Sequence, residues 1–222
     1  MDILQFILAP ENRFWHQTIA YLQLCGFSIL ISVALGVVLG IAVSRNAFLG
    51  FIAINLSGLM RAIPVIAFLI AVLPYLGLGF LPAAIALIIL GIPPVLLNTY
   101  TGLRGIDPAI IDAAKGMGMT TLQIISRIQA PLVMPVLAAG VRTAAIQIVA
   151  TATLAAFIGA DGYGIYIVDG LYKLNNTEIL AGAIPVAILA LLIEVLMGWL
   201  QTALTPTGLR TSRTVESVIQ EQ

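Results

Sequence analysis

Five long apolar runs constrain the fold of this chain more than any other feature of its sequence. A helix needs about 20 apolar residues to cross about 30 Å of hydrocarbon, and each run is long enough. With 60% hydrophobic and only 9% charged residues, the 222-residue chain has more apolar surface than a soluble core of this size could bury. We therefore expect an all-α polytopic membrane protein, with five transmembrane helices near 18–43, 51–73, 81–100, 132–160 and 178–204.

The basic residues give these spans an orientation, because Lys and Arg near span ends are retained on the cytoplasmic side. If the N-terminus is outside, the outer segments hold only Arg13 and Lys173. The inner loops and tail then hold Arg45, Arg104, Lys115, Arg127, Arg210 and Arg213. We expect an outer interfacial segment over 1–17, a transmembrane domain over 18–204 and a cytoplasmic polar tail over 205–222.

Several function classes find no support in the sequence. A formal net charge of zero gives no indication of nucleic acid as a partner. The lone Cys25 and lone His16 form neither a disulfide nor a metal site, and we expect a buried Cys25 and an interfacial His16. The chain has no G-x-x-x-x-G-K-[ST] motif and no cluster of catalytic residue types, so we expect no cofactor and no enzymatic activity.

Charged residues inside the spans are expensive in lipid and are therefore candidates for function. Arg61 precedes Pro64, which can bend the second span; Arg61 lies either beside a pathway or simply at the membrane interface. Glu194 lies in the last span, as a functional acid or as an ion-pair partner of Arg142 or Arg61. The residues that could line a translocation pathway are Arg61, Pro64, Asn98, Gln147, Thr151, Thr153 and Phe157.

Glycines and prolines give further expectations for the spans. Gly36 and Gly40 have GxxxG spacing, which allows close helix approach. Two consecutive prolines, at 93 and 94, predict that the third span is not straight. The small and hydroxyl residues of the fourth span suit a pathway wall or a subunit interface. We expect the glycine-containing segment from Asp161 to Thr177 to be a flexible outer loop.

The polar stretch from Gly102 to Pro131 interrupts the apolar sequence and predicts two short helices. Asp107 is a candidate N-cap followed by Pro108, and two glycines at 116 and 118 end this first helix. Thr120 and Gln123 form a capping-box pair that begins a second helix, which stops before Pro131.

The second of these helices is amphipathic, with apolar residues at three-residue spacing: Leu122, Ile125 and Ile128. A DNA-binding helix-turn-helix does not fit, because only two basic residues lie between Asp107 and Pro131. From local physics, the helix could rest on the bilayer surface or dock into a groove on a partner.

One spacing pattern in this stretch resembles the EAA loop of ATP-binding cassette (ABC) importer permeases. That pattern is E-A-A, three residues, G, nine residues, I, one residue and L-P; here its positions fall at 112–114, Gly118, Ile128 and Pro131. The first residue is aspartate instead of glutamate, and Ala130 replaces the leucine. The segments RAIP (61–64) and TATLAAFIGADGYG (151–164) are similar to permeases for quaternary-ammonium osmoprotectants.

The resemblance implies a type I ABC importer permease fold in a bacterial or archaeal inner membrane. It further implies ATP-driven import of glycine betaine, choline or carnitine. The alternatives are an ABC permease for another small solute such as an amino acid or, in less agreement with the resemblance, a secondary transporter subunit. The implied partners are two ABC ATPase subunits that bind ATP and Mg, a second permease copy or paralogue, an extracytoplasmic substrate-binding protein and the lipid bilayer. The implied ATPase-docking residues are Asp112, Ala113, Ala114, Gly116, Gly118, Thr120, Thr121, Leu122, Ile125, Ile128 and Pro131.

Overall fold

Helices make up nearly all of the computed structural model, which describes residues 3–204. The predicted tail over 205–222 and the side chain of Arg61 lie outside the described residues. The long helices are α2 (Phe14–Ser44), α5 (Phe80–Arg104), α8 (Ala130–Thr151) and α10 (Asn176–Leu204). The shorter elements are α1 (Ile3–Leu8), α3 (Ala47–Ala62), α4 (Val65–Leu76), α6 (Pro108–Gly116), α7 (Thr121–Ile124), α9 (Gly164–Lys173) and the short turns η1 (Pro10–Asn12), η2 (Ile125–Gln129) and η3 (Ala152–Ile158).

The expected membrane spans correspond to these helices. Four stretches in the described chain are long and apolar enough to cross a bilayer: Phe14–Ser44, Phe80–Arg104, Thr121–Ile158 and Asn176–Ala203. The second expected span is broken, because Ala47–Met60 and Val65–Leu76 meet at 92°. Ile63 and Pro64 are extended at the break (ψ 120° and 125°), which confirms the predicted bend near Pro64.

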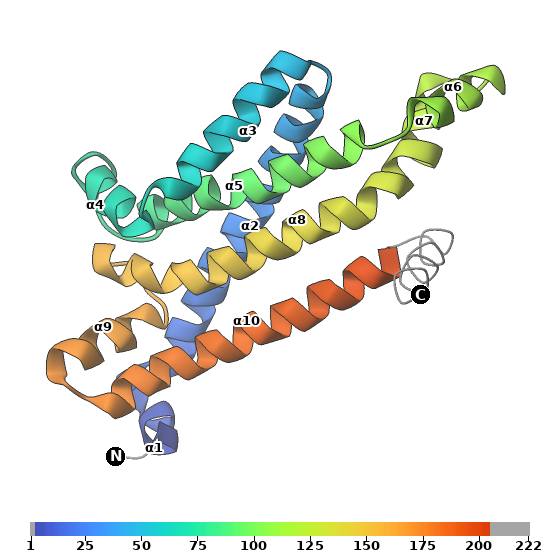
Figure 1. Cartoon of the computed structure of the whole chain (residues 1–222). Coiled ribbons are helices and arrows are strands. Elements are labelled where there is room, and N and C mark those ends of the chain that lie inside the picture. The colour runs from blue at the N-terminus through green and yellow to red at the C-terminus, as the bar shows by residue number, and fades with distance from the viewer. Residues whose placement is uncertain (1–2, 205–222) are drawn as a thin grey trace, which may run out of the picture.

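Helices α2, α5 and α8 form the centre of the molecule, and α10 lies alongside α8 (Figure 1). Glycines allow the first two to approach closely: a Cβ on Gly36 would lie 2.6 Å from the Cβ of Val95, and one on Gly40 would lie 2.5 Å from that of Thr99. The GxxxG pair therefore packs within the chain. Helix α5 continues without a break through its two consecutive, fully buried prolines.

The segment after η3 is a packed helical cap, so the expected flexible loop is wrong. The backbone N–H of Gly162 donates to Oε1 of Gln17 over 2.6 Å, and the hydroxyl of Tyr163 donates to Thr18 over 3.0 Å. Gly164 lies directly against the backbone carbonyl of Thr153, where no side chain would fit. The glycines thus serve close approach between backbones, a role that sequence cannot distinguish from flexibility.

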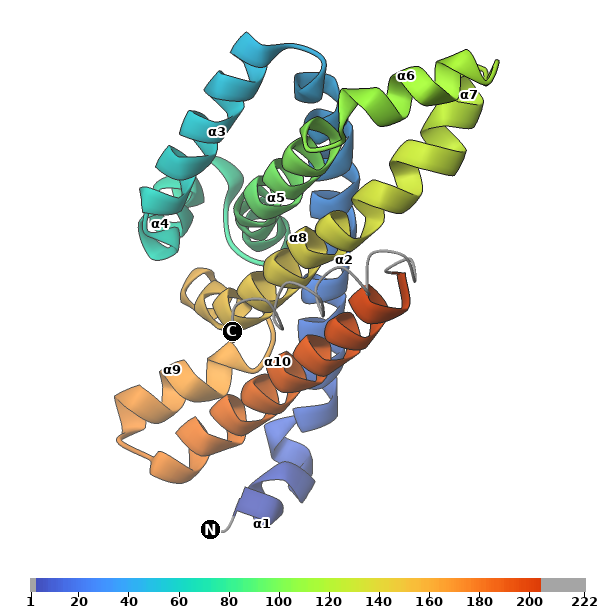
Figure 2. The ribbon, with the colours of Figure 1, turned by 45° about the vertical axis from the view of Figure 1, so that its right-hand side comes forward.

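Aromatic rings fasten this cap to the N-terminal segment. Phe6 meets Tyr166 edge to face at 5.4 Å, and Phe14 stacks on the same ring at 6.0 Å. The Tyr166 hydroxyl donates to the carbonyl of Asn12 over 2.7 Å, and burial raises the pKa of Tyr166 to about 12. Helices α1 and α9 therefore gather at one end of the molecule, opposite α6 and α7 (Figures 1 and 2).

Candidate functional site

The first helix of the polar stretch begins and ends as its capping signals predict. Oδ1 of Asp107 accepts a hydrogen bond from the backbone N–H of Ala109 over 2.8 Å, and Pro108 occupies the first turn of α6. After the last turn, Gly118 has a φ of 77°, which is open to glycine at no steric cost. The chain then reverses into α7.

The second helix begins at the predicted capping box. The backbone N–H of Gln123 donates to Oγ1 of Thr120 over 3.4 Å, and the N–H of Thr120 donates to Oε1 of Gln123 over 2.8 Å. We call residues 107–124, with their two helices and the turn between them, the α6–α7 hairpin.

The predicted stop before Pro131 is wrong, because α7 runs through the π-helical turn η2 into α8. Pro131 lies in the first turn of α8, where its missing N–H and its ring must be accommodated. A π turn just before it widens the backbone locally, and such turns are one known way in which helices absorb a misfit. Residues Thr121–Ile158 therefore form one helical stretch of 38 residues.

The hairpin presents apolar side chains to its surroundings at the turn. Leu122 is 75% exposed and Met117 is 72% exposed, and Ile125 is also exposed. Ile128 is half-buried and Ile124 is buried, so the inward side chain was not among the predicted anchors. We define Met117 and Leu122 as the apolar tip of the hairpin; Ile125 follows it as the first residue of η2.

The other predicted docking residues lie on α6 or at the start of α7. Ala114 is buried, whereas Ala113, Gly116, Thr120 and Thr121 are exposed. The carboxylate of Asp112 forms an exposed ion pair with Lys115, at 3.2 Å between Oδ1 and Nζ. Asp112, which stands at the glutamate position of the EAA pattern, is therefore paired within its own helix.

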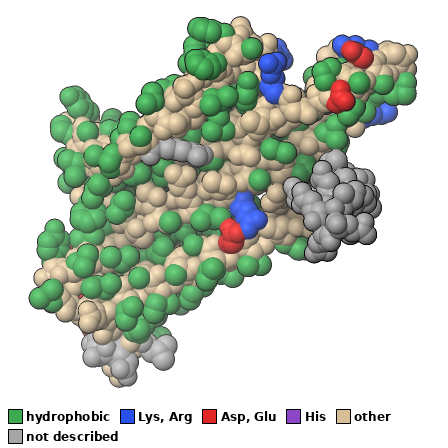
Figure 3. Space-filling view, in the orientation of Figure 1, with side chains coloured by type: hydrophobic (Ala, Val, Ile, Leu, Met, Phe, Trp, Pro, Cys, Tyr) green, Lys and Arg blue, Asp and Glu red, His purple; other side chains and the backbone are tan. Residues whose placement is uncertain are grey.

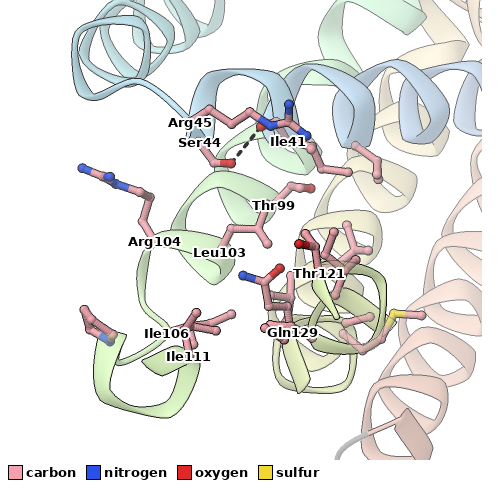
Figure 4. A pocket seen from close by; sticks show the side chains of 18 of the residues that line it. Ile41, Ser44, Arg45, Thr99, Leu103, Arg104, Ile106, Ile111, Thr121 and Gln129 are labelled. Carbon is pink, nitrogen blue, oxygen red and sulfur yellow. Dashed lines mark hydrogen bonds between the residues drawn. The ribbon is translucent and has the colours of Figure 1, made fainter. Parts of the chain in front are cut away.

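A cavity of about 880 Å³ lies between the hairpin and the membrane spans (Figure 4). Its walls come from the C-terminal ends of α2 and α5, from both helices of the hairpin and from the start of α8. Arg45 and Arg104 are among the residues that line it, with their side chains directed away from each other, and Ile41, Leu103 and Ile111 are among its apolar side chains. Sequence analysis did not find this cavity, since its walls come from segments far apart in the chain.

Arg142 of α8 and Glu194 of α10 form an ion pair within the membrane-spanning region. Sequence left Arg142 and Arg61 as alternative partners, and the structure pairs Glu194 with Arg142. The two side chains are 33% and 39% exposed. Figure 3 shows one basic and one acidic side chain side by side on a face with many hydrophobic side chains.

The predicted pathway residues lie on several elements of the described chain. Asn98 donates to the carbonyl of Pro94 over 2.8 Å and lies against Gly140, about 10 Å along α8 from Gln147. Pro64 lies at the elbow between α3 and α4, whereas Thr153 and Phe157 lie in η3. An apolar pocket of about 220 Å³ at the elbow is lined by other residues, Met60 and Phe68 among them. The pathway assignment therefore stays a prediction.

Comparison with known proteins identifies the family. The model of the family described as "Binding-protein-dependent transport system inner membrane component" matches residues 32–207. The chain belongs to this family. It is thus an ABC importer permease, an integral membrane component of a binding-protein-dependent transport system.

Relatives of this permease align over nearly their whole length. It is 39% identical to the carnitine transport permease protein OpuCB of Listeria monocytogenes, with 95% of this chain and 97% of the relative covered. It is 34% identical to the choline transport system permease protein OpuBB of Bacillus subtilis, over 94% and 96%. It is 30% identical to the osmoprotectant import permease protein OsmW of Salmonella typhimurium, over 95% and 100%.

The fold of this permease is also found in a solved structure. A chain of the MetNI methionine ABC transporter, in an inward-facing conformation, superimposes with a TM-score of 0.73 at 23% sequence identity. The match covers 84% of this chain and 94% of the other. The expected type I ABC importer permease fold is therefore confirmed.

Proposed function

We propose that this permease is the non-catalytic, membrane-spanning subunit of an ATP-driven importer for quaternary-ammonium osmoprotectants such as glycine betaine, choline and carnitine. The observation that carries the substrate class is the near full-length similarity to permeases named for carnitine, choline and osmoprotectants. The likeness to the methionine transporter supports the fold alone. Import of an amino acid is therefore the weaker alternative.

The α6–α7 hairpin is the proposed docking site for the ATPase. A helix that docks in a groove needs exposed apolar anchors, and Met117 and Leu122 offer them at the tip. Because α7 continues into α8, movement of a docked hairpin would pass directly into the fourth span. ATP binding and hydrolysis by two ATPase subunits would in this way drive rigid-body rocking between inward-open and outward-open states.

The charge distribution supports a cytoplasmic position for the hairpin. Among the described residues, the end that carries it has four basic residues, Arg45, Arg104, Lys115 and Arg127, against two acidic residues, Asp107 and Asp112. The opposite end has, within residues 3–204, two basic residues, Arg13 and Lys173, against four acidic residues, Glu11, Asp161, Asp169 and Glu178. Excess Lys and Arg favour the cytoplasmic side, so the N-terminal segment would lie outside and the tail inside.

The remaining partners follow from the family. A second permease, identical or paralogous, would complete the pathway, and an extracytoplasmic binding protein would deliver the substrate. The proposed pathway residues on this chain are Arg61, Pro64, Asn98, Gln147, Thr151, Thr153 and Phe157.

An uptake assay tests the proposed function. The permease is expressed with its ATPase and binding protein in cells that lack their own osmoprotectant uptake. We expect radiolabelled carnitine, choline or glycine betaine to accumulate, whereas methionine should not. Accumulation that persists when the ATPase is deleted would contradict ATP-driven import, and uptake of methionine alone would contradict the substrate class.

A further inference from the structure

We propose that the apolar pocket at the bend between α3 and α4, which we call the elbow pocket, binds the quaternary-ammonium group of the substrate. The proposal rests on the proposed function and adds a place where the permease holds the substrate. Three features support it: backbone carbonyls without helical donors, an aromatic ring in the wall and a position in the middle of a membrane span.

The elbow pocket has a volume of about 220 Å³ and lies where the bend of the broken span meets α5 (Figure 1). Exposed Ile63 and buried Pro93 both line it, so the pocket runs from the surface of the chain to its core. Along α5, Ile89 lies about 14 Å after Phe80, and Pro93 lies about 17 Å before Arg104. The pocket is therefore near the middle of this span, where membrane transporters commonly hold their substrates beside interrupted helices.

Prolines leave two backbone carbonyls of the pocket wall without their helical donors. Because proline has no N–H, the carbonyl of Ile89 receives no hydrogen bond from Pro93. In the same way, the carbonyl of Met60 receives none from Pro64. Ile89 and Pro93 are one turn apart and both line the pocket, so the carbonyl between them lies on the face of α5 that borders it. Every described side chain in the wall is apolar, so none can donate in place of the missing N–H groups.

These carbonyls favour a cationic occupant over a lipid acyl chain. A carbonyl without a partner in the hydrocarbon region costs free energy, and an acyl chain in the pocket would leave it without one. A quaternary-ammonium group spreads its positive charge over methyl groups, whose C–H bonds contact carbonyl oxygens favourably. Its surface is otherwise apolar, so it also fits the aliphatic side chains of the wall.

Phe68 supplies the aromatic surface that quaternary-ammonium groups prefer. Its side chain is half-buried on α4 and lines the pocket. A cation over the face of such a ring is attracted by the negative charge of its π-system. No acidic residue is among the described residues of the wall, so the attraction stays weak. Weak binding suits a pathway, because the substrate has to leave it again.

Saturation-transfer-difference NMR of the purified full-length permease in a maltoside detergent tests the proposal. The two probes are choline and 3,3-dimethyl-1-butanol, which has the shape of choline but no charge. We expect wild type to bind choline in preference to the neutral analogue. Phe68→Leu, which removes the ring and keeps an apolar side chain, should bind choline about five- to tenfold more weakly. Phe51→Leu is the matched control, because Phe51 of α3 is 65% exposed and does not line the pocket.

Two proline variants test the role of the carbonyl. Pro93→Ala supplies an N–H to the carbonyl of Ile89, so choline binding should fall about fivefold. Pro94→Ala is the matched control, since it removes the same kind of fully buried ring from α5. Pro94 does not line the pocket, so alanine there should leave choline binding unchanged. Melting temperatures close to that of wild type verify that each variant is folded.

Uptake by the same variants, expressed with the ATPase and the binding protein, separates this proposal from the proposed function. Choline import by wild type, together with choline binding that neither Phe68→Leu nor Pro93→Ala weakens, would overturn the site and leave the function intact. Selective choline binding that both variants weaken, in a permease that imports only methionine, would support the site and contradict the function. Absence of choline binding to wild type, or equal binding of choline and its neutral analogue, would also overturn the site.

Discussion

Arg142 and Glu194 form an ion pair between the middle of α8 and the middle of α10. Each charge alone would be costly inside a bilayer, and pairing lowers that cost for both. Gly198, one turn after Glu194, lies beside the guanidinium, which would be in ordinary van der Waals contact, at 3.6 Å, with a Cβ at that position. The pair therefore links α8, the span into which the hairpin continues, to α10, the last span.

Glu194→Gln should destabilise the permease, because the charge of Arg142 then stays in the membrane without a partner. We expect a loss of about 1–3 kcal/mol, less than for a fully buried pair because both side chains are about a third exposed. Thermal unfolding in detergent measures the effect. R142Q/E194Q should be more stable than either single variant; additive losses would show that the two charges do not interact.

Gly118→Val should weaken association with the ATPase while the membrane helices stay folded. The φ of 77° at this turn costs a side chain about 1–2 kcal/mol, and a β-branched residue fits it worst. Open space surrounds the position, so the effect would come from backbone geometry rather than from a clash. Gly118→Asn is the matched control, because asparagine tolerates this conformation. Equal ATPase binding by both variants would contradict the role of the turn.

Leu122→Asp should abolish ATPase association with little effect on the stability of the isolated permease. The side chain is 75% exposed, so the change removes a docking anchor and leaves the core intact. Co-purification of the ATPase and the melting temperature of the permease are the two measurements. Leu122→Met, which preserves apolar volume, should behave as wild type, and normal co-purification of the aspartate variant would exclude the tip as the docking surface.

Gly140→Ala should lower the melting temperature, whereas Gly26→Ala should not. A Cβ at Gly140 would lie 2.7 Å from the Cβ of Asn98 and 2.8 Å from the carbonyl oxygen of Pro94, so α5 and α8 would have to separate. Overpacking of this kind costs about 1–3 kcal/mol. Gly26 has no atom within 4 Å of its Cβ position, and alanine there favours the helix by about 1 kcal/mol. Equal melting temperatures would show that the helices adjust without cost.

Local signals in the sequence predicted the features that depend on a few neighbouring residues. Span length gave the long helices, and the caps at Asp107 and Thr120 form the predicted hydrogen bonds. The expected stop before Pro131 was wrong because a π turn that ends two residues earlier, at Gln129, accommodates the proline, and residue propensities do not indicate such a turn. The expectation of a flexible loop after η3 was wrong because Gly164 packs against the backbone carbonyl of a residue in another element.

The candidate site was predictable only as a segment. The spacing of 112–131 located the hairpin, but the burial of Ile124 and the exposure of Met117 depend on tertiary structure that the spacing does not contain. From the sequence, Arg61 and Arg142 were both candidate ion-pair partners of Glu194, and the structure pairs Glu194 with Arg142. The cavity behind the hairpin likewise depends on how segments far apart in the chain are brought together.

The helical stretch Thr121–Ile158 changes its winding twice, with a π turn at Ile125–Gln129 and a 3₁₀ segment at Ala152–Ile158. Winding of either kind is weaker than α-helix, and within helices it often marks a hinge. The α-helical part between them, about 33 Å long, then behaves as a stiff rod with a joint at each end. Changes of state in this permease should therefore be seen first as a change of winding at these two joints, with α8 itself unaltered.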